Sequence, residues 1–101
     1  PSSIMVLDLT DRAVYITGAG SGIGKATALR FAAAGAKVFL VGRTESKLVE
    51  TQKEIAELHP KVEVAYAVVD LTQKKQIEDS IKAVLGKFGE ISIVFANGMT
   101  L

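Results

Sequence analysis

Predominantly apolar runs alternate along the chain with longer segments that mix apolar and polar positions. The apolar runs predict four strands, at residues 13–16, 37–41, 62–69 and 91–96. The segments between them predict three helices, because apolar residues recur at helical spacing or because alanine and leucine dominate. These helices cover residues 25–34, a segment that Thr44 or Ser46 caps and His59–Pro60 ends, and a segment between a Thr72 cap and Gly89.

The order of strand, loop, helix and loop recurs up to the fourth strand. Such alternation predicts an α/β fold with a parallel sheet, right-handed crossovers and helices on both faces. The continuous apolarity of Ala13–Ile16 is typical of a parallel strand buried on both sides. A length of 101 residues is enough for one small domain.

Each predicted strand is followed by glycine or by a polar residue. The first strand leads into the stretch Thr17–Gly24, and the next three are followed by Arg43, Asp70 and Asn97. The carboxyl ends of parallel strands meet at one rim, where open α/β sheets bind their ligands. The sequence therefore predicts one ligand site built from all four strand exits.

The stretch Thr17–Gly24 holds four glycines within seven residues. A strand that breaks at glycines and restarts as a helix points backbone N–H groups, and the positive end of the helix dipole, at one place. Each glycine costs roughly 0.5–1 kcal/mol relative to alanine in a regular element, so four together indicate a close approach to a ligand. The stretch predicts an anion site, most simply one for a phosphate.

Composition excludes several other functions. A net charge of +1 provides no basic field for nucleic acid. The chain has no cysteine, which excludes thiolate metal sites and fits a cytoplasmic protein, and the single His59 cannot build a histidine metal site alone. Membrane helices need about 20 consecutive apolar residues, and no run approaches that length. We expect no metal, nucleic-acid or membrane contact.

The glycine spacing is Thr-Gly-x-x-x-Gly-x-Gly, and Asp70-Leu71 and Ala96-Asn97-Gly98 follow the third and fourth strands. With these three motifs the chain resembles the N-terminal, cofactor-binding half of the classical short-chain dehydrogenase/reductase family. The resemblance implies a three-layer, doubly wound Rossmann-type sheet, here with about four strands in the order 3-2-1-4 and three helices. It also implies that residues 1–101 are the N-terminal part of a single NAD(P)-binding domain.

The resemblance assigns cofactor-binding roles to six residues of the glycine stretch: Gly18, Gly20, Ser21, Gly22, Ile23 and Gly24. The first would make the tight turn, and the last would let the helix pack close to the sheet. Those between would present backbone groups, together with the Ser21 hydroxyl, to the ribose phosphate and the pyrophosphate.

The resemblance also assigns roles at the later strand exits. Asp70 would accept a hydrogen bond from the adenine amino group, the Leu71 backbone would hold the ring, and Asn97 would lie near the adenosine ribose. The alternative interpretation of Asp70 is a carboxylate at the start of a helix, and that of Asn97 is an asparagine in an ordinary turn.

The exit of the second strand bears on the choice between NADP(H) and NAD(H). A carboxylate there would bind the ribose 2′-hydroxyl of NAD(H) and repel a 2′-phosphate. This chain has Gly42 followed by Arg43, a permanently charged fork that suits a phosphate. We therefore expect NADP(H), with NAD(H) as the alternative and a solvated loop arginine as the other interpretation of Arg43. Lys25 or Lys47 could add a second positive charge.

The chain also departs from the family pattern. Residues 95–99, Phe-Ala-Asn-Gly-Met, replace the usual Asn-Asn-Ala-Gly, and Ser92 stands where an aspartate is common. The family's catalytic Tyr-x-x-x-Lys pair lies beyond the fourth strand. Tyr15 and Tyr66 do not supply it, because Ala19 and Asp70 stand four residues after them. We expect no catalytic residue in this chain and no activity from it alone.

Three functions fit these observations. The first is the nucleotide-binding half of an NADP(H)-dependent oxidoreductase that acts on a carbonyl or alcohol substrate and is a homo-oligomer when whole. The second is a nucleotide-binding or regulatory module without catalysis. The third is a structural fragment that needs a partner to cover its apolar fourth strand.

Overall fold

The computed structural model describes residues 8–97 and contains one parallel sheet of four strands in the order β3-β2-β1-β4. The predicted strand order is therefore confirmed. The elements follow one another as β1 (Ala13–Thr17), α1 (Gly22–Ala33), β2 (Lys37–Gly42), α2 (Glu45–Leu58), β3 (Val64–Val68), α3 (Lys74–Phe88) and β4 (Ile93–Phe95).

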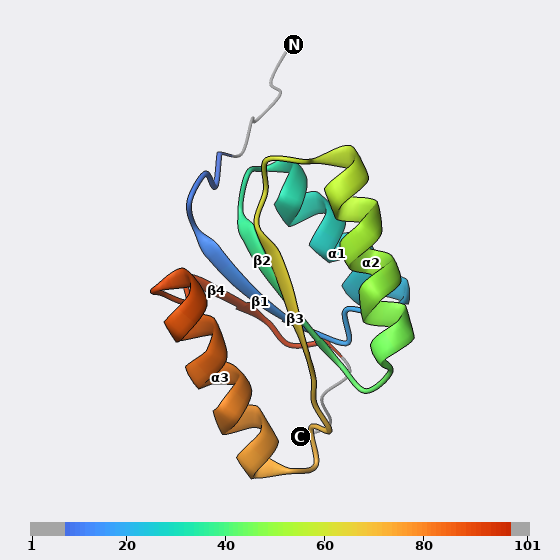
Figure 1. Cartoon of the computed structure of the whole chain (residues 1–101), viewed down its shortest axis with the longest axis vertical. Helices are drawn as coiled ribbons and strands as arrows, with labels where there is room; N and C mark the ends of the chain where they lie inside the picture. The colour runs from blue at the N-terminus through green and yellow to red at the C-terminus, as the bar shows by residue number, and fades with distance from the viewer. Residues whose placement is uncertain (1–7, 98–101) are drawn as a thin grey trace.

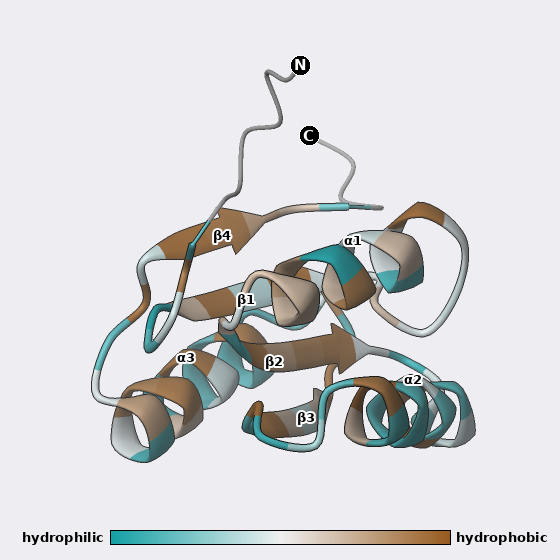
Figure 2. Cartoon of the chain, turned by 90° about the horizontal axis from the view of Figure 1, so that it is seen from above, coloured by the Kyte–Doolittle hydropathy of each residue, from teal (hydrophilic) through white to brown (hydrophobic). Residues whose placement is uncertain are grey.

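The three helices form two outer layers around this sheet. Helices α1 and α2 cover one face, and α3 covers the other (Figures 1 and 2). Each face has its own apolar cluster. Ile16, Leu40 and Ile55 are fully buried members of the cluster beneath α1 and α2, while Phe39 and Phe88 belong to the cluster beneath α3. Alternate residues of each central strand thus serve opposite faces, as the pleat requires.

The two central strands are apolar because both of their faces are covered. All five residues of β1 are buried, and so are residues 38–41 of β2. Their register pairs Ala13 with Lys37 and Thr17 with Val41, so both strands end at the same rim. Truncating a fully buried side chain such as Ile16 to alanine would cost about 2–5 kcal/mol.

Most element ends differ from the predicted ones by one or two residues, and β3 covers 64–68 instead of 62–69. Helix α1 begins at Gly22, three residues earlier than expected, because the glycines continue directly into the helix. Strand β4 is shorter than predicted, because only Ile93–Phe95 pair with β1. Thr72 does not cap α3: its hydroxyl donates to Asp70, and Gln73 occupies the cap position.

Glycines follow the ends of two helices. Gly35 follows α1 with a φ of +90°, and Gly89 follows α3 with a φ of +79°. Both angles lie in the left-handed region that glycine enters without strain.

Candidate functional site

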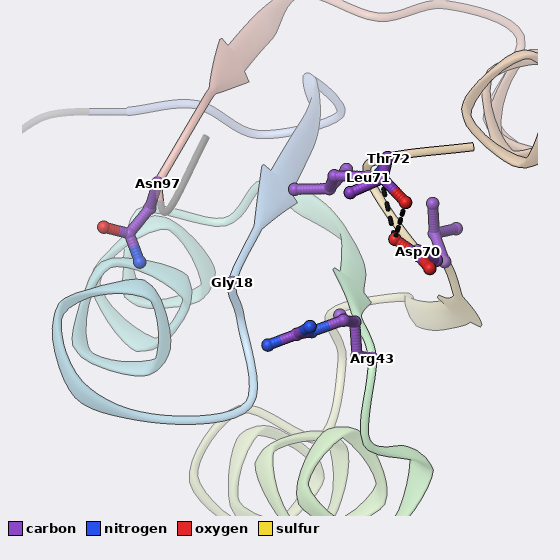
Figure 3. A pocket seen from close by; sticks show the side chains of 8 residues that line it. Gly18, Arg43, Asp70, Leu71, Thr72 and Asn97 are labelled. Atoms are coloured by element: carbon purple, nitrogen blue, oxygen red, sulfur yellow. Dashed lines mark hydrogen bonds between the residues drawn. The ribbon is translucent and has the colours of Figure 1, made fainter. Parts of the chain in front are cut away.

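The exits of all four strands meet at one rim and enclose a cavity of about 320 Å³. Its walls come from the ends of β1, β2, β3 and β4, and the residues that line it are Gly18, Gly42, Arg43, Val69, Asp70, Leu71, Thr72 and Asn97. In Figure 3 the Arg43 side chain extends from its strand exit towards the glycine turn at Gly18, with Asp70 and Thr72 across from it. The predicted convergence of strand exits is thus present.

A second cavity of about 220 Å³ adjoins the first and shares Gly18, Gly42 and Arg43 with it. It lies between the glycine turn and the first turn of α2, and its remaining lining residues are Gly20, Ser21, Thr44, Lys47 and Leu48. This lining includes two cationic and two hydroxyl side chains but no carboxylate. The second cavity is therefore suited to an anion.

The glycine turn owes its shape to two positions. Gly18 has a φ of +62°, where a side chain would be strained. At Gly24, a Cβ atom would lie less than 3.0 Å from the carbonyl oxygen of Gly18. Helix α1 consequently packs directly against the end of β1. Only glycine at position 24 permits this close contact.

The start of α1 has unused hydrogen-bond donors. The first N–H groups of a helix have no partner within it. Ser21 occupies the N-cap position in an extended conformation, yet its hydroxyl makes no capping hydrogen bond. Within residues 8–97, the backbone N–H groups of Ser21, Gly22 and Ile23 donate to no protein acceptor. These donors and the helix dipole form an anion-binding terminus.

Thr17 joins the exits of β1 and β4. Its Oγ1 donates to the carbonyl oxygen of Asn97 at 2.9 Å and accepts from the Asn97 N–H at 2.8 Å. A Cβ atom on Gly18 would lie 2.8 Å from Asn97, so the two exits also pack tightly. Thr17 opens the glycine motif, but the sequence did not predict this link to the exit of β4. The available signal was a β-branched polar residue in an otherwise apolar strand.

Asp70 is ionised and held in place by its own loop. Its Oδ1 accepts from the Thr72 hydroxyl at 2.7 Å and from the Thr72 N–H at 2.9 Å. The hydroxyl bond lowers the pKa of Asp70 most, the backbone bond lowers it further, and the positive charge of Arg43 adds to the effect. The carboxylate is thus a hydrogen-bond acceptor at neutral pH, with Arg43 as the nearby cation.

The two lysines considered in the sequence analysis behave differently. Lys25 forms an ion pair with Glu54 at 2.5 Å, and the hydrogen bond to this carboxylate raises the pKa of Lys25. Lys47 forms no ion pair within the described residues and lines the second cavity beside Arg43. Only Lys47 is therefore placed to add positive charge to that cavity.

Seven of the ten predicted cofactor-binding residues line the two cavities: Gly18, Gly20, Ser21, Arg43, Asp70, Leu71 and Asn97. The other three are the first three residues of α1. Gly22 and Ile23 are exposed, and Gly24 is buried against Gly18. Gly98 and Met99, which bear on the register of the fourth strand exit, lie outside the described residues.

The tyrosines lie in the sheet. Tyr15 is buried, and its hydroxyl is 2.7 Å from that of Ser80 on α3. Tyr66 donates to Glu45 at 3.0 Å. Among residues 8–97 there is no group of three potential metal ligands, and no helix is both long and apolar enough to cross a membrane.

Several known proteins have sequences similar to this one. The sequence profile of the family described as short chain dehydrogenase matches residues 12–100. Levodione reductase from Leifsonia aquatica is 42% identical over 88 residues, which cover 87% of this chain and 33% of that protein. The chain thus spans about a third of the length of such relatives.

Solved structures share the fold. The L-sorbose reductase of Gluconobacter frateurii, complexed with NADPH and L-sorbose, has a TM-score of 0.88 and 31% identity, over 95% of this chain and 36% of that one. An NAD+-bound xylitol dehydrogenase has a TM-score of 0.80 and 29% identity, over 85% of this chain and 32% of that one.

Proposed function

Because the chain belongs to the short-chain dehydrogenase family, we propose that it carries the adenosine- and pyrophosphate-binding part of an NADP(H)-dependent oxidoreductase. The whole protein would transfer hydride between this cofactor and a carbonyl or alcohol substrate, and it would act as a homo-oligomer. The bound nicotinamide would supply the hydride, and this part of the protein would hold and orient the cofactor.

The observation that carries the choice of NADP(H) is the composition of the second cavity. Arg43 and Lys47 line it together with the hydroxyl groups of Ser21 and Thr44, and no carboxylate does. An unphosphorylated ribose needs an acceptor for its 2′-hydroxyl, whereas a 2′-phosphate needs cations and donors. Structural neighbours are known with either cofactor, so the lining residues are what favour the phosphorylated one.

The pyrophosphate, the adenine ring and the adenosine ribose of the cofactor each suit a different group at the strand exits. The unused N–H groups at the start of α1 suit the pyrophosphate, since a helix N-terminus favours negative charge. Asp70 and Leu71 line the larger cavity and suit the adenine ring, with the carboxylate accepting from its amino group. Asn97, fixed by Thr17, suits the adenosine ribose. We place no catalytic residue in the described part of the chain.

Titration of the intact protein with NADPH and with NADH tests this proposal. We expect NADPH to bind more tightly, and Arg43→Ala to weaken NADPH about tenfold or more while leaving NADH nearly unchanged. The expected size follows from charge-assisted hydrogen bonds worth about 1.5–3 kcal/mol. Arg30→Ala is the matched control, because Arg30 is exposed in the last turn of α1 and lines neither cavity.

The outcomes separate the candidate functions. No binding of either cofactor by the intact protein would refute the oxidoreductase and the nucleotide-binding module together. Binding without turnover of any carbonyl or alcohol would support the module. Equal loss of NADPH and NADH affinity in Arg43→Ala would contradict the assignment of Arg43 to the 2′-phosphate.

A further inference from the structure

Thr51 connects the middle of α2 to the glycine turn. Its side chain is fully buried, and its hydroxyl lies 3.1 Å from the carbonyl oxygen of Ala19 and 3.1 Å from that of Lys47. The Lys47 contact is the usual one between a helical threonine and the carbonyl four residues earlier. The Ala19 contact spans 32 residues and reaches the turn itself. A role in helix α2 alone would not require it.

The first turn of α2 packs tightly against the same region. A Cβ atom on Gly20 would lie 2.8 Å from the Cβ of Lys47, and one on Gly42 would lie 3.1 Å from the Leu48 side chain. The start of α2 therefore packs closely against Gly20 and Gly42, which both line the second cavity. The position of Lys47 beside Arg43 depends on this contact.

Both backbone polar groups of Ala19 form hydrogen bonds. Its N–H donates to the Val41 carbonyl oxygen at 3.1 Å, and its carbonyl accepts from Thr51. In a trans peptide the carbonyl and the following N–H point in opposite directions. Thr51 therefore fixes the direction of the Gly20 N–H, which has no protein acceptor within residues 8–97.

We propose that Thr51 is a positioning residue for cofactor selectivity, because its hydroxyl sets the relative position of the glycine turn and the first turn of α2. This inference rests on the proposed function, which assigns the pyrophosphate to the glycine turn and the 2′-phosphate to Arg43 and Lys47. NADPH must contact both sides of this junction at once, whereas NADH has no phosphate at the α2 side. A shift between the two sides therefore penalises NADPH more than NADH.

Thr51→Val tests the inference, since it keeps the branched shape and removes the hydroxyl. In the intact protein we expect a five- to tenfold loss of NADPH affinity, about the effect of one hydrogen bond, and a smaller loss for NADH. Thr51→Ser retains the hydroxyl and should preserve most of the selectivity. The backbone amide resonance of Gly20 should shift in Thr51→Val without cofactor, which gives a readout independent of binding.

Ser80→Ala is the matched control for general destabilisation. Ser80 is also a buried helical hydroxyl that donates to a carbonyl of its own helix, but it lies on α3 and lines neither cavity at the rim. It should lower the melting temperature and leave the ratio of NADPH to NADH affinity unchanged. A lower melting temperature with an unchanged ratio in Thr51→Val would overturn the inference and make Thr51 purely structural.

Two further measurements keep the inference testable. If Thr51→Val does not fold, Gly20→Ala places a Cβ against Lys47 and should reduce the selectivity in the same direction. In a Lys47→Ala background, Thr51→Val should change the affinity ratio much less, because Thr51 acts on the 2′-phosphate through the first turn of α2, which carries Lys47. Wild-type protein that prefers NADH would refute the proposed function, whereas an NADPH preference insensitive to Thr51 would refute this inference alone.

Discussion

Gly24 lies so close to the carbonyl oxygen of Gly18 that no side chain fits between them. A Cβ atom at Gly24 would approach that oxygen and its carbonyl carbon to less than 3.0 Å, and it would also lie 3.1 Å from the Asn97 side chain. The start of α1, the end of β1 and the exit of β4 are therefore in mutual contact at one glycine. The site depends on this contact, because the same turn presents the unused N–H groups.

Gly24→Ala should consequently both destabilise the protein and weaken cofactor binding. Overpacking of this kind costs about 1–3 kcal/mol, and here the obstacle is backbone, which cannot rotate away. Chemical denaturation and titration with NADPH measure the two effects. Gly86→Ala is the control, because Gly86 lies in α3 with open space around its Cα and no positive φ.

The control variant Gly86→Ala should itself change the stability, in the opposite direction to Gly24→Ala. Alanine is favoured over glycine inside a helix by roughly 0.5–1 kcal/mol, so Gly86→Ala should stabilise the protein and leave NADPH affinity unchanged. If Gly24→Ala and Gly86→Ala have the same stability and the same NADPH affinity, the close approach to Gly18 does not restrict position 24 to glycine.

Thr17→Val should separate the exits of β1 and β4. Thr17 is buried, and its hydroxyl forms both a donated and an accepted hydrogen bond with the Asn97 backbone. Valine would leave both backbone groups without this partner, at a cost of about 1–3 kcal/mol. Hydrogen exchange at the Asn97 amide should accelerate, and the free energy of unfolding should fall. Thr17→Ser, which keeps the hydroxyl, should retain slow exchange at Asn97.

Asp70 should titrate below its usual range because Thr72 donates two hydrogen bonds to it. A pKa that is lower in the folded state gives stability that is present above the unfolded pKa, near 3.8, and is lost as the pH falls through the folded value. Thr72→Val removes the larger cause, so the pKa of Asp70 should rise towards its ordinary value. Nuclear magnetic resonance titration of the carboxyl carbon measures it directly.

Thr72→Ser supplies the matched control, since it keeps a hydroxyl at the same position. Its Asp70 pKa should stay low. The unfolding free energies of wild type and Thr72→Val should differ above about pH 3.8 and converge in stronger acid. An unchanged Asp70 pKa in Thr72→Val would show that the backbone bond or Arg43 dominates instead.

The strand order and the convergence of strand exits could be predicted because both follow from a regular alternation and from the rules of parallel sheets. The contacts that fix the site could not. The importance of Thr17 and Thr51 comes from acceptors 80 and 32 residues away, which the sequence pattern around each threonine does not identify. Thr51 had one weak signal, since it lies between Leu48 and Ile55 on the apolar stripe of α2, where a polar side chain needs a buried partner.

Local propensity gave wrong element ends where a tertiary contact was stronger. Glycine disfavours helices, which placed the expected start of α1 after Gly24, yet close packing on Gly18 draws the glycines into the helix. Thr72 is a good capping residue by type, but its hydroxyl serves Asp70. In both cases the competing contact lies in the candidate site, where local rules are expected to fail.

The exposed side of β4 should make the isolated chain of residues 1–101 associate. Val94 on this strand is 60% exposed, and it lines an apolar cavity of about 210 Å³ with Ile81 and Ile91. An uncovered apolar edge strand is a site for intermolecular pairing. Val94→Thr should therefore reduce association in sedimentation velocity at matched concentration. Leu58→Thr, which changes a residue 64% exposed at the end of α2 and outside this cavity, should not. Equal association of all three chains would mean that the β4 surface is not the contact.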